Sequence, residues 1–297
     1  MESSFSVLFG NSNCGKSFWA LDLAAAIATG RKFRNEHDVS RGAVVYVSLE
    51  GIYGMRNRVE AMMRSGLLDE DSPLFFCQAK LSMLDPENAA RFTATIEEAD
   101  RSGSSCVLVV IDTMARAMAG GDENSGLDMG VAMKWVDTVR DATSAAILLV
   151  HHSGKDASRG ARGHSSLRAA IDSELEITVK EGQRLLTVKK QRDLEFADPM
   201  PFTLKTVDLG ESKKGKKITS CVVSHIHPEP GEPVSPKSGR PPKGSAEDLL
   251  ALLPVDSKKE WEKKAKEELD IGRTRFYDLF KQLDGRWKKE GGKLVSV

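Results

Sequence analysis

The chain has 297 residues, and 43 Lys and Arg residues are balanced by 43 Asp and Glu residues. This length fits one large domain or one large and one small domain. With 29% charged and 40% hydrophobic residues, the composition is that of an ordinary globular protein rather than a disordered chain or a coiled coil. A net charge of zero gives no global basic field for nucleic acid, although a neutral total can conceal opposed regions.

Several features bear on the cellular compartment. No apolar run approaches the roughly 20 residues that a membrane-spanning helix needs. The first ten residues have neither the basic start nor the apolar stretch of a signal peptide. The four cysteines are far apart and form no CxxC pair, as is typical of reduced thiols. We therefore expect a cytoplasmic protein with no membrane partner.

The first two-thirds of the chain alternates short apolar runs with segments of helical periodicity. The predicted strands are 5–9, 43–49, 74–77, 107–111 and 146–150, and the predicted helices between them are 17–29, 53–65, 86–102 and 127–143. This alternation predicts an α/β fold with a mostly parallel sheet flanked by helices. Beyond residue 172, four more predicted strands joined by turns indicate a β-hairpin extension, at 175–179, 185–190, 202–207 and 218–224.

The last quarter of the chain has a different organisation. Residues 228–243 contain six prolines and predict an extended linker. We place a large domain at 1–227, the linker at 228–244 and a small domain at 245–297. The small domain has three predicted helices and a hairpin, the order of a winged-helix module, at 246–253, 258–269, 273–283 and 286–297. From residue 237 onward, 15 Lys and Arg outnumber 11 Asp and Glu, so the tail is modestly basic.

One motif points directly to phosphate chemistry. The run Gly10-Asn11-Ser12-Asn13-Cys14-Gly15-Lys16-Ser17 matches GxxxxGK[ST] between a predicted strand and a predicted helix. Such a loop turns backbone N–H groups toward phosphate oxygens at a helix N-terminus. Lys16 is expected to reach the β- and γ-phosphates, and Ser17 to bind Mg²⁺. We assign nucleotide binding to this run and to Phe18, which follows it.

Polar residues end three other predicted strands. Asp112 ends an apolar strand, the arrangement that holds the Mg²⁺ shell beside a P-loop. Glu50 follows another strand and is a candidate general base, although a solvated glutamate at a strand end is the alternative. His151 and His152 end a third. Neighbours on a strand face opposite sides, so only one can face this site, and a shared metal ion is not expected.

Together these residues resemble the RecA-like ATPase core, and most closely the RepA-type hexameric replicative helicases of plasmids and phages, with DnaB-type helicases more distant. The stretches that carry the resemblance span residues 5–225 and are GNSNCGKS, VVYVSLEG, VLVVIDTMARAMAGGDEN, LLVHHSGKDASRGARGHSSLRAAID and LTVKKQRD. The resemblance implies a RecA-like fold, Mg-ATP as the bound nucleotide, Glu50 as the residue that activates water, and His152 as the γ-phosphate sensor.

The resemblance also implies partners. The loop 153–165 resembles the family's DNA-binding loop, and its cations Lys155, Arg159 and Arg162 suit backbone phosphates; a solvated surface loop is the alternative. The loop 116–126 is a second candidate, but Asp122 and Glu123 would repel phosphate. Lys190 and Arg192 resemble the K-x-R element that completes a neighbouring subunit's ATP site; a basic end to an edge strand is the alternative.

The leading hypothesis is therefore a homo-oligomeric ring, expected to be a hexamer, that hydrolyses ATP between subunits to move along single-stranded DNA and unwind duplex during replication. Because the P-loop strand begins at residue 5, we expect no preceding domain of the kind DnaB-like helicases use for assembly or primase contact, although replication proteins such as primase are possible partners. In the tail, Arg273 and Arg275 are candidate DNA contacts; a solvated packing module is the alternative. Two rival functions are a RecA-like recombination or repair ATPase and a regulatory or partner-loading ATPase.

Overall fold

The computed structural model describes residues 3–77, 81–100, 103–154, 160–180, 182–212, 214–227, 245–269, 271–283 and 285–296. The chain divides into two compact units, Met1–Val234 and Ser235–Val297. The boundary between them falls inside the predicted linker 228–244, which lies outside the described residues.

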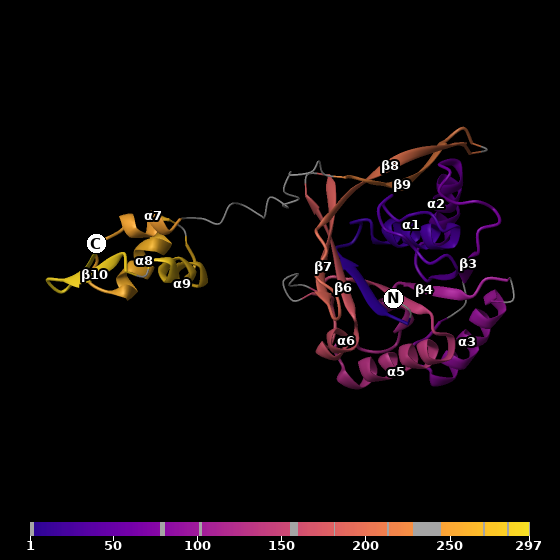
Figure 1. Cartoon of the computed structure of the whole chain (residues 1–297), viewed down its shortest axis with the longest axis horizontal. Coiled ribbons are helices and arrows are strands. Elements are labelled where there is room, and N and C mark those ends of the chain that lie inside the picture. Colours follow the sequence, from indigo (N-terminus) through magenta and orange to yellow (C-terminus); the bar gives the residue numbers. More distant parts are fainter. Residues whose placement is uncertain are drawn as a thin grey trace. The chain divides into compact units, whose positions relative to one another are not determined.

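The first unit is built on one nine-stranded sheet with the order β3-β2-β4-β5-β1-β6-β7-β8-β9 (Figure 1). Six neighbouring strands are parallel: β1 (Phe5–Gly10), β2 (Ala43–Ser48), β3 (Leu74–Cys77), β4 (Cys106–Asp112), β5 (Ala146–His152) and β6 (Ser173–Lys180). The other three are antiparallel: β7 (Gln183–Gln191), β8 (Met200–Glu211) and β9 (Lys217–His225). The predicted RecA-like, mostly parallel α/β fold with an antiparallel extension is confirmed.

Helices cover both faces of the parallel strands. Helices α1 (Lys16–Thr29) and α2 (Ile52–Arg64) lie on one face, and α3 (Pro86–Asp100) and α5 (Gly126–Thr143) on the other (Figure 1). Two hydrophobic cores result, because alternate side chains of a strand point to opposite faces. Val45 and Ile111 pack toward α3 and α5, whereas Val44 and Val110 pack toward α1 and α2. None of the described helices is long and apolar enough to cross a membrane.

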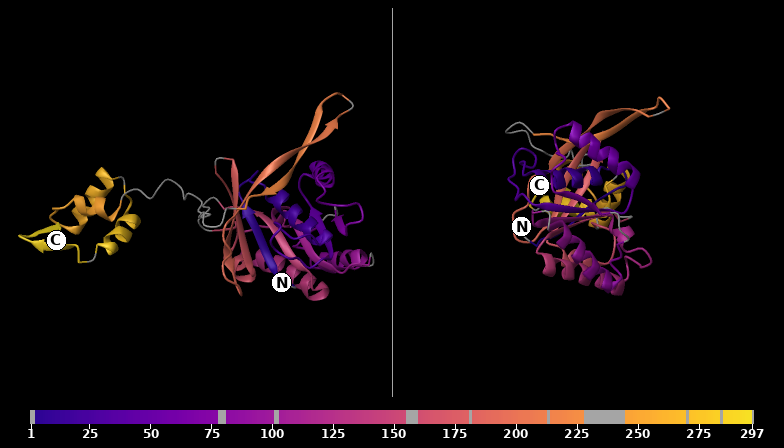
Figure 2. Two further views of the ribbon diagram at one scale, coloured as in Figure 1. Left: turned by 45° about the horizontal axis from the view of Figure 1, so that its top comes forward. Right: turned by 90° about the vertical axis from the view of Figure 1, so that its right-hand side faces the viewer.

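Strands β8 and β9 form a hairpin that is longer than predicted and extends away from the rest of the sheet (Figure 2). Only the segment of β8 from Met200 to Phe202 pairs with β7. Farther along the hairpin, Arg64 of α2 donates a hydrogen bond from Nη1 to the carbonyl oxygen of Asp208 at 3.3 Å. The hairpin therefore leaves the plane of the sheet and lies against the helices of one face.

Two short helices were not predicted. They are α4 (Met114–Ala117), directly after β4, and α6 (Ser165–Ala170), between β5 and β6. With four and six residues, each is too short to show a helical period in the sequence. Buried Met114 and Leu167 attach them to the core that contains α5. Both helices lie next to segments that carry candidate site residues.

The second unit contains α7 (Ala246–Ala251), α8 (Lys258–Glu268), α9 (Arg273–Gln282) and an antiparallel pair, β10 (Trp287–Glu290) and β11 (Lys293–Ser296). The element order agrees with the predicted three helices and hairpin. Its core is aromatic: Trp261 is fully buried, donates from Nε1 to the carbonyl oxygen of Leu249 at 2.7 Å, and contacts Phe276 edge-on. Arg273 and Arg275 lie in α9, but their side chains are outside the described part of the structure.

Candidate functional site

The P-loop joins β1 to α1 in the order that the sequence predicts. Gly10 ends β1, and a Cβ atom there would overlap the carbonyl oxygen of Ile177 on β6. Gly15, at φ +102°, caps the N-terminus of α1 in a conformation that favours glycine. Lys16 is 6% exposed and donates from Nζ to the carbonyl oxygens of Gly10 and Asn11 at 2.9 and 2.8 Å. The loop therefore already surrounds a cation at the start of a helix, as a phosphate cradle requires.

Asp112 ends β4 beside this loop and is 2% exposed. Its Oδ2 accepts a hydrogen bond from the hydroxyl of Tyr46 at 2.8 Å. Burial raises the pKa of the Asp112 carboxyl, and hydrogen bonds from Ser17 and Tyr46 oppose that rise. Burial, together with the Asp112 charge, raises the pKa of Tyr46 well above its usual value. The Ser17 hydroxyl and the Asp112 carboxylate lie together and supply the hard oxygen ligands that Mg²⁺ prefers.

Strand register brings these groups together. Gly10 pairs with His152, and Ser48 pairs with Asp112, so the carboxyl ends of β1, β2, β4 and β5 lie at one edge of the sheet. A pocket of about 400 Å³ opens there and is lined by residues Ser12, Asn13, Gly15, Lys16, Ser17, Phe18, Glu50, Gly51, Arg58, Asp112, Thr113, His152 and Leu204. The predicted candidates Lys16, Ser17, Asp112, Glu50 and His152 therefore share one pocket.

The two histidines divide as strand alternation predicts. His152 lines the pocket, whereas His151 is fully buried with Nε2 2.7 Å from the carbonyl oxygen of Arg162. Burial lowers the pKa of His151 to about 4. His151 is therefore neutral near pH 7, and Nε2–H donates to the Arg162 carbonyl. Among the described residues, no cluster of three or more His, Cys, Asp or Glu side chains could hold a metal ion.

Arg58 is a pocket residue that the sequence analysis missed. It lies on α2, and its guanidinium stacks 4.6 Å above the ring of Phe18. The Arg58 charge lowers the pKa of Asp112, although less than Ser17 and Tyr46 do. The position of Arg58 two helical turns beyond Glu50 is the signal that could have identified it, since α2 begins at the edge of the sheet where β2 ends.

The predicted DNA-binding loop is only partly described. Lys155 and Arg159 lie outside the described residues. Arg162 is described, and its Nε lies 3.1 Å from Oε2 of Glu123, an acid that the sequence analysis expected to repel phosphate. Glu123 is thus the counter-ion of a candidate DNA-binding cation. Its backbone carbonyl also accepts a hydrogen bond from His164 N at 2.8 Å.

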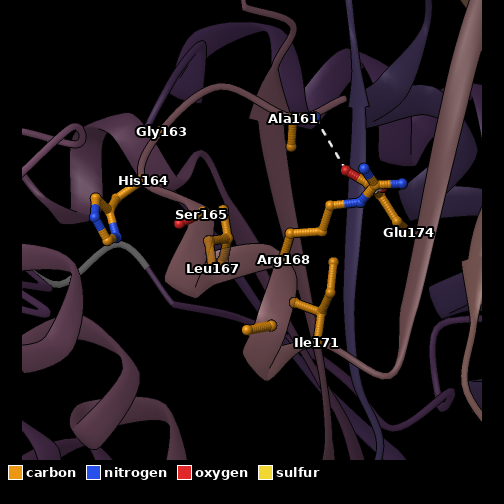
Figure 3. A pocket seen from close by; sticks show the side chains of 9 residues that line it. Ala161, Gly163, His164, Ser165, Leu167, Arg168, Ile171 and Glu174 are labelled. Carbon is orange, nitrogen blue, oxygen red and sulfur yellow. Dashed lines mark hydrogen bonds and ion pairs between the residues drawn. The ribbon is translucent and has the colours of Figure 1, made fainter. Parts of the chain in front are cut away.

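The C-terminal end of that loop is anchored by a second buried acid. Glu174 of β6, which is 1% exposed, accepts a hydrogen bond from Ala161 N at 3.0 Å and forms an ion pair with Arg168 of α6 at 3.1 Å. Figure 3 shows the Glu174 carboxylate beside the Arg168 guanidinium at the wall of a pocket of about 500 Å³. This cavity borders the loop and is separate from the nucleotide pocket.

Lys190 and Arg192 lie away from their own chain's nucleotide pocket. Lys190 pairs with Glu174, near the start of β6, whereas Gly10 of the P-loop pairs with Ile177 farther along. Lys190 Nζ donates to the carbonyl oxygens of Arg168 and Ile171 at 2.6 and 2.5 Å, and Arg192 forms an ion pair with Asp172 at 2.9 Å. The structure therefore does not bring either cation to the P-loop of the same chain.

The other end of β7 does reach the P-loop. Arg184 donates from Nε to the carbonyl oxygen of Cys14 at 3.1 Å and packs against Gly15. The sequence analysis missed this contact, because its two partners are 170 residues apart. A motif search identifies the loop, but only the strand order shows which later strand lies beside it.

The comparisons with known proteins bear on this geometry. Residues 1–158, more than half of the chain, match the AAA domain family. This range includes β1, the P-loop, Glu50, Asp112 and both histidines. No curated protein matches the sequence. The chain therefore belongs to the AAA domain family and carries the nucleotide-binding fold of a P-loop ATPase.

Proposed function

We propose that this protein is a ring-forming DNA helicase that hydrolyses Mg-ATP between subunits and moves along single-stranded DNA, as the RepA-type helicases that it resembles do. The observation that carries the proposal is the single pocket in which Lys16, Ser17, Asp112, Glu50 and His152 meet. Every one of these side chains comes from the P-loop or from the carboxyl end of a parallel strand, where open α/β sheets bind their ligands.

Each residue has a physical role in this proposal. The backbone of the P-loop and Lys16 hold the β- and γ-phosphates, and Phe18 and Arg58 line the same pocket. Ser17 and Asp112 would hold Mg²⁺, whose charge offsets that of the phosphates when it is bound. Glu50 accepts a proton from the attacking water. His152 senses the γ-phosphate and directly precedes the 153–165 loop. Within that loop, the backbone N–H of Arg162 donates to the His152 carbonyl at 3.1 Å.

The position of Lys190 and Arg192 supports the involvement of a second subunit. A cation that cannot reach the nucleotide of its own chain acts on γ-phosphate charge only if a neighbouring chain supplies the nucleotide. Such a head-to-tail contact closes into a ring when the rotation between subunits permits it. Single-stranded DNA would then contact the 153–165 loop, and replication proteins such as primase are candidate partners of the assembly.

The test is steady-state ATP hydrolysis with and without single-stranded DNA, for wild type and Arg192→Ala. Arg91→Ala is the matched control, because Arg91 is an exposed, ion-paired arginine on α3. We expect DNA to stimulate wild type, and Arg192→Ala to lose hydrolysis by at least about 10³-fold while it still binds nucleotide. Mixing Arg192→Ala with the hydrolysis-deficient Lys16→Ala should restore part of the activity. In a mixed ring, an intact P-loop of one variant meets an intact Arg192 of the other.

Two results would redirect the proposal. A nucleotide-dependent filament on DNA without unwinding would favour a recombination ATPase. If DNA does not stimulate hydrolysis and Arg192→Ala hydrolyses ATP like wild type, a regulatory or partner-loading ATPase is favoured. The second compact unit, with its helices and hairpin, gives that alternative a module for docking a partner.

A further inference from the structure

The two oxygens of the Glu50 carboxylate have different surroundings. Oε1 of Glu50 accepts a hydrogen bond from the hydroxyl of Thr113 at 3.0 Å, and Nε of Arg116 lies 3.4 Å from the same oxygen. In the part of the chain that the structure describes, no hydrogen bond or ion pair engages Oε2. Both partners of Glu50 therefore bind one oxygen and leave the other available to the pocket.

The sheet fixes the position of Thr113. The pairing of β2 with β4 also sets the separation between the Thr113 and Glu50 backbones. Thr113 is 3% exposed and follows Asp112, the last residue of β4. Strands β2 and β4 pair in register up to Ser48 and Asp112, and Leu49 N then donates to the Asp112 carbonyl oxygen at 2.7 Å. Two hydrogen-bonded strand ends thus carry the carboxylate and the hydroxyl that binds it.

Arg116 is placed differently. It lies on α4 with its side chain 66% exposed, and its separation from Oε1 is longer than that of Thr113. Solvent screens an exposed ion pair and leaves it with little net stabilisation. The buried hydroxyl of Thr113 is therefore the stronger of the two restraints on Glu50.

We propose that Thr113 is a positioning residue for ATP hydrolysis, holding Oε1 of Glu50 so that Oε2 receives the proton of the attacking water; the inference rests on the proposed function. The water oxygen bonds to the γ-phosphorus as the bond from that phosphorus to the β–γ bridging oxygen breaks. The bridging oxygen leaves on ADP with the electron pair, and the water's proton passes to Oε2. Glu50 is the catalytic residue of this step, and Thr113 acts only through it.

A free glutamate side chain rotates among several rotamers. Glu50 follows β2 and has 38% of its side chain exposed, so the pocket walls restrict it little. A hydrogen bond from a buried hydroxyl selects the rotamers in which Oε1 faces β4. Loss of that bond should lower the fraction of bound complexes that react, without weakening the binding of ATP, which Glu50 does not hold.

The experiment measures kcat and KM for ATP in the full-length protein with saturating single-stranded DNA. We expect Thr113→Val to lower kcat about 10-fold with KM within about twofold of wild type, and Thr113→Ser, which keeps the hydroxyl, to recover most of the loss. Arg116→Ala should cost no more than about threefold. Thr93→Val is the matched control, because the Thr93 hydroxyl donates to the Ala89 carbonyl within its own helix, α3, away from the pocket.

The variant Glu50→Gln separates failure of the inference from failure of the proposed function. If Glu50→Gln abolishes hydrolysis and Thr113→Val turns over like wild type, the positioning role is wrong and the proposed base stands. If Glu50→Gln hydrolyses ATP like wild type, the proposed base itself is wrong. A loss in Thr113→Ser as large as that in Thr113→Val would also overturn the positioning role, since the hydroxyl would then not be the group that matters.

Should Thr113→Val fail to fold, Thr113→Ala and Thr113→Ser replace it. Both lack the methyl group of threonine, and they differ only in the hydroxyl. The inference then predicts a kcat about 10-fold lower for Thr113→Ala than for Thr113→Ser, at equal melting temperatures within a few degrees. Equal kcat values in this pair would overturn it.

Discussion

The nucleotide pocket and the end of the sheet that carries Lys190 and Arg192 differ in whether their cations are paired with carboxylates. In the pocket, Lys16 Nζ donates to two backbone carbonyls and a thiol, and no carboxylate of the described residues forms an ion pair with it. At the other end, Arg192 is bound to Asp172, and nearby Arg168 is bound to Glu174. The first region is prepared for a phosphate, whereas a partner of the second must compete with groups of the chain itself.

After the loss expected for Arg192→Ala, the largest expected effect comes from the phosphate-binding lysine of the pocket. Lys16→Ala should lower kcat/KM for ATP by about 10²- to 10³-fold, because it removes a cation that interacts with developing phosphate charge in a site shielded from water. Lys134→Ala, on the exposed side of α5, is the control. Circular dichroism should show both variants folded. Near-wild-type turnover of Lys16→Ala would exclude this pocket as the site of hydrolysis.

The next effect concerns the end of β5, where the pocket meets the predicted DNA-binding loop. Between pH 6.5 and 4 the native state binds fewer protons than the unfolded state, because the pKa of His151 is lowered to about 4 by burial. The free energy of unfolding should therefore rise with pH across this window, and acidification should cost about 3 kcal/mol from this residue. Urea unfolding at pH 7 and pH 4 measures it.

His151→Gln should lose most of that pH dependence, whereas His37→Gln, at an exposed position, should keep it. If wild type and His151→Gln show the same slope of stability against pH, other groups cause the acid sensitivity and His151 is not held neutral. The comparison between variants matters more than the absolute value, since several carboxyl groups titrate in the same range.

A third test examines how the chain orients Asp112. Tyr46→Phe removes the hydroxyl that binds Oδ2, which should weaken Mg²⁺ activation about fivefold, the effect of one lost hydrogen bond of about 1 kcal/mol. Because that hydrogen bond opposes the rise in the pKa of Asp112, its loss lets a proton compete better with the cation. The rise in the Mg²⁺ concentration for half-maximal activity should thus be larger at pH 6 than at pH 8.

Tyr277→Phe, in the second compact unit, is the control for the loss of a tyrosine hydroxyl. A pH-independent effect in Tyr46→Phe would show that the hydroxyl fills space and does not affect protonation of Asp112. An unchanged Mg²⁺ requirement would place the metal-binding oxygens elsewhere in the pocket.

Within the nucleotide pocket itself, the sequence predicts some features and not others. The P-loop, Glu50, Asp112 and His152 were predictable because each is adjacent in sequence to an apolar strand, and parallel strands end at one edge. The bond between Tyr46 and Asp112 joins residues 66 positions apart, and that between Arg184 and Cys14 joins residues 170 apart. Such contacts depend on strand order and register, which local patterns do not fix. The pairing of Arg162 with Glu123 was missed for the same reason.

The smallest expected effect concerns a cation that is paired with a carboxylate of its own chain. Arg162, a candidate DNA contact, forms an ion pair with Glu123, whose side chain is 10% exposed. Phosphate must displace this carboxylate, so Glu123→Gln should raise the affinity for single-stranded DNA about two- to threefold, a gain that fits a partly exposed ion pair. Fluorescence anisotropy with a labelled oligonucleotide measures it, and the gain should shrink at high salt.

Asp137→Asn controls for net charge, because it also removes one negative charge but lies on α5 and pairs with Arg140. If the two variants gain equal affinity for DNA, the gain comes from the change in net charge, and the ion pair between Glu123 and Arg162 does not limit DNA binding. If Glu123→Gln weakens DNA binding instead, the ion pair positions Arg162 for phosphate rather than competing with it. In that case the acids of the 116–126 loop support the DNA-binding surface, contrary to the expectation that they repel it.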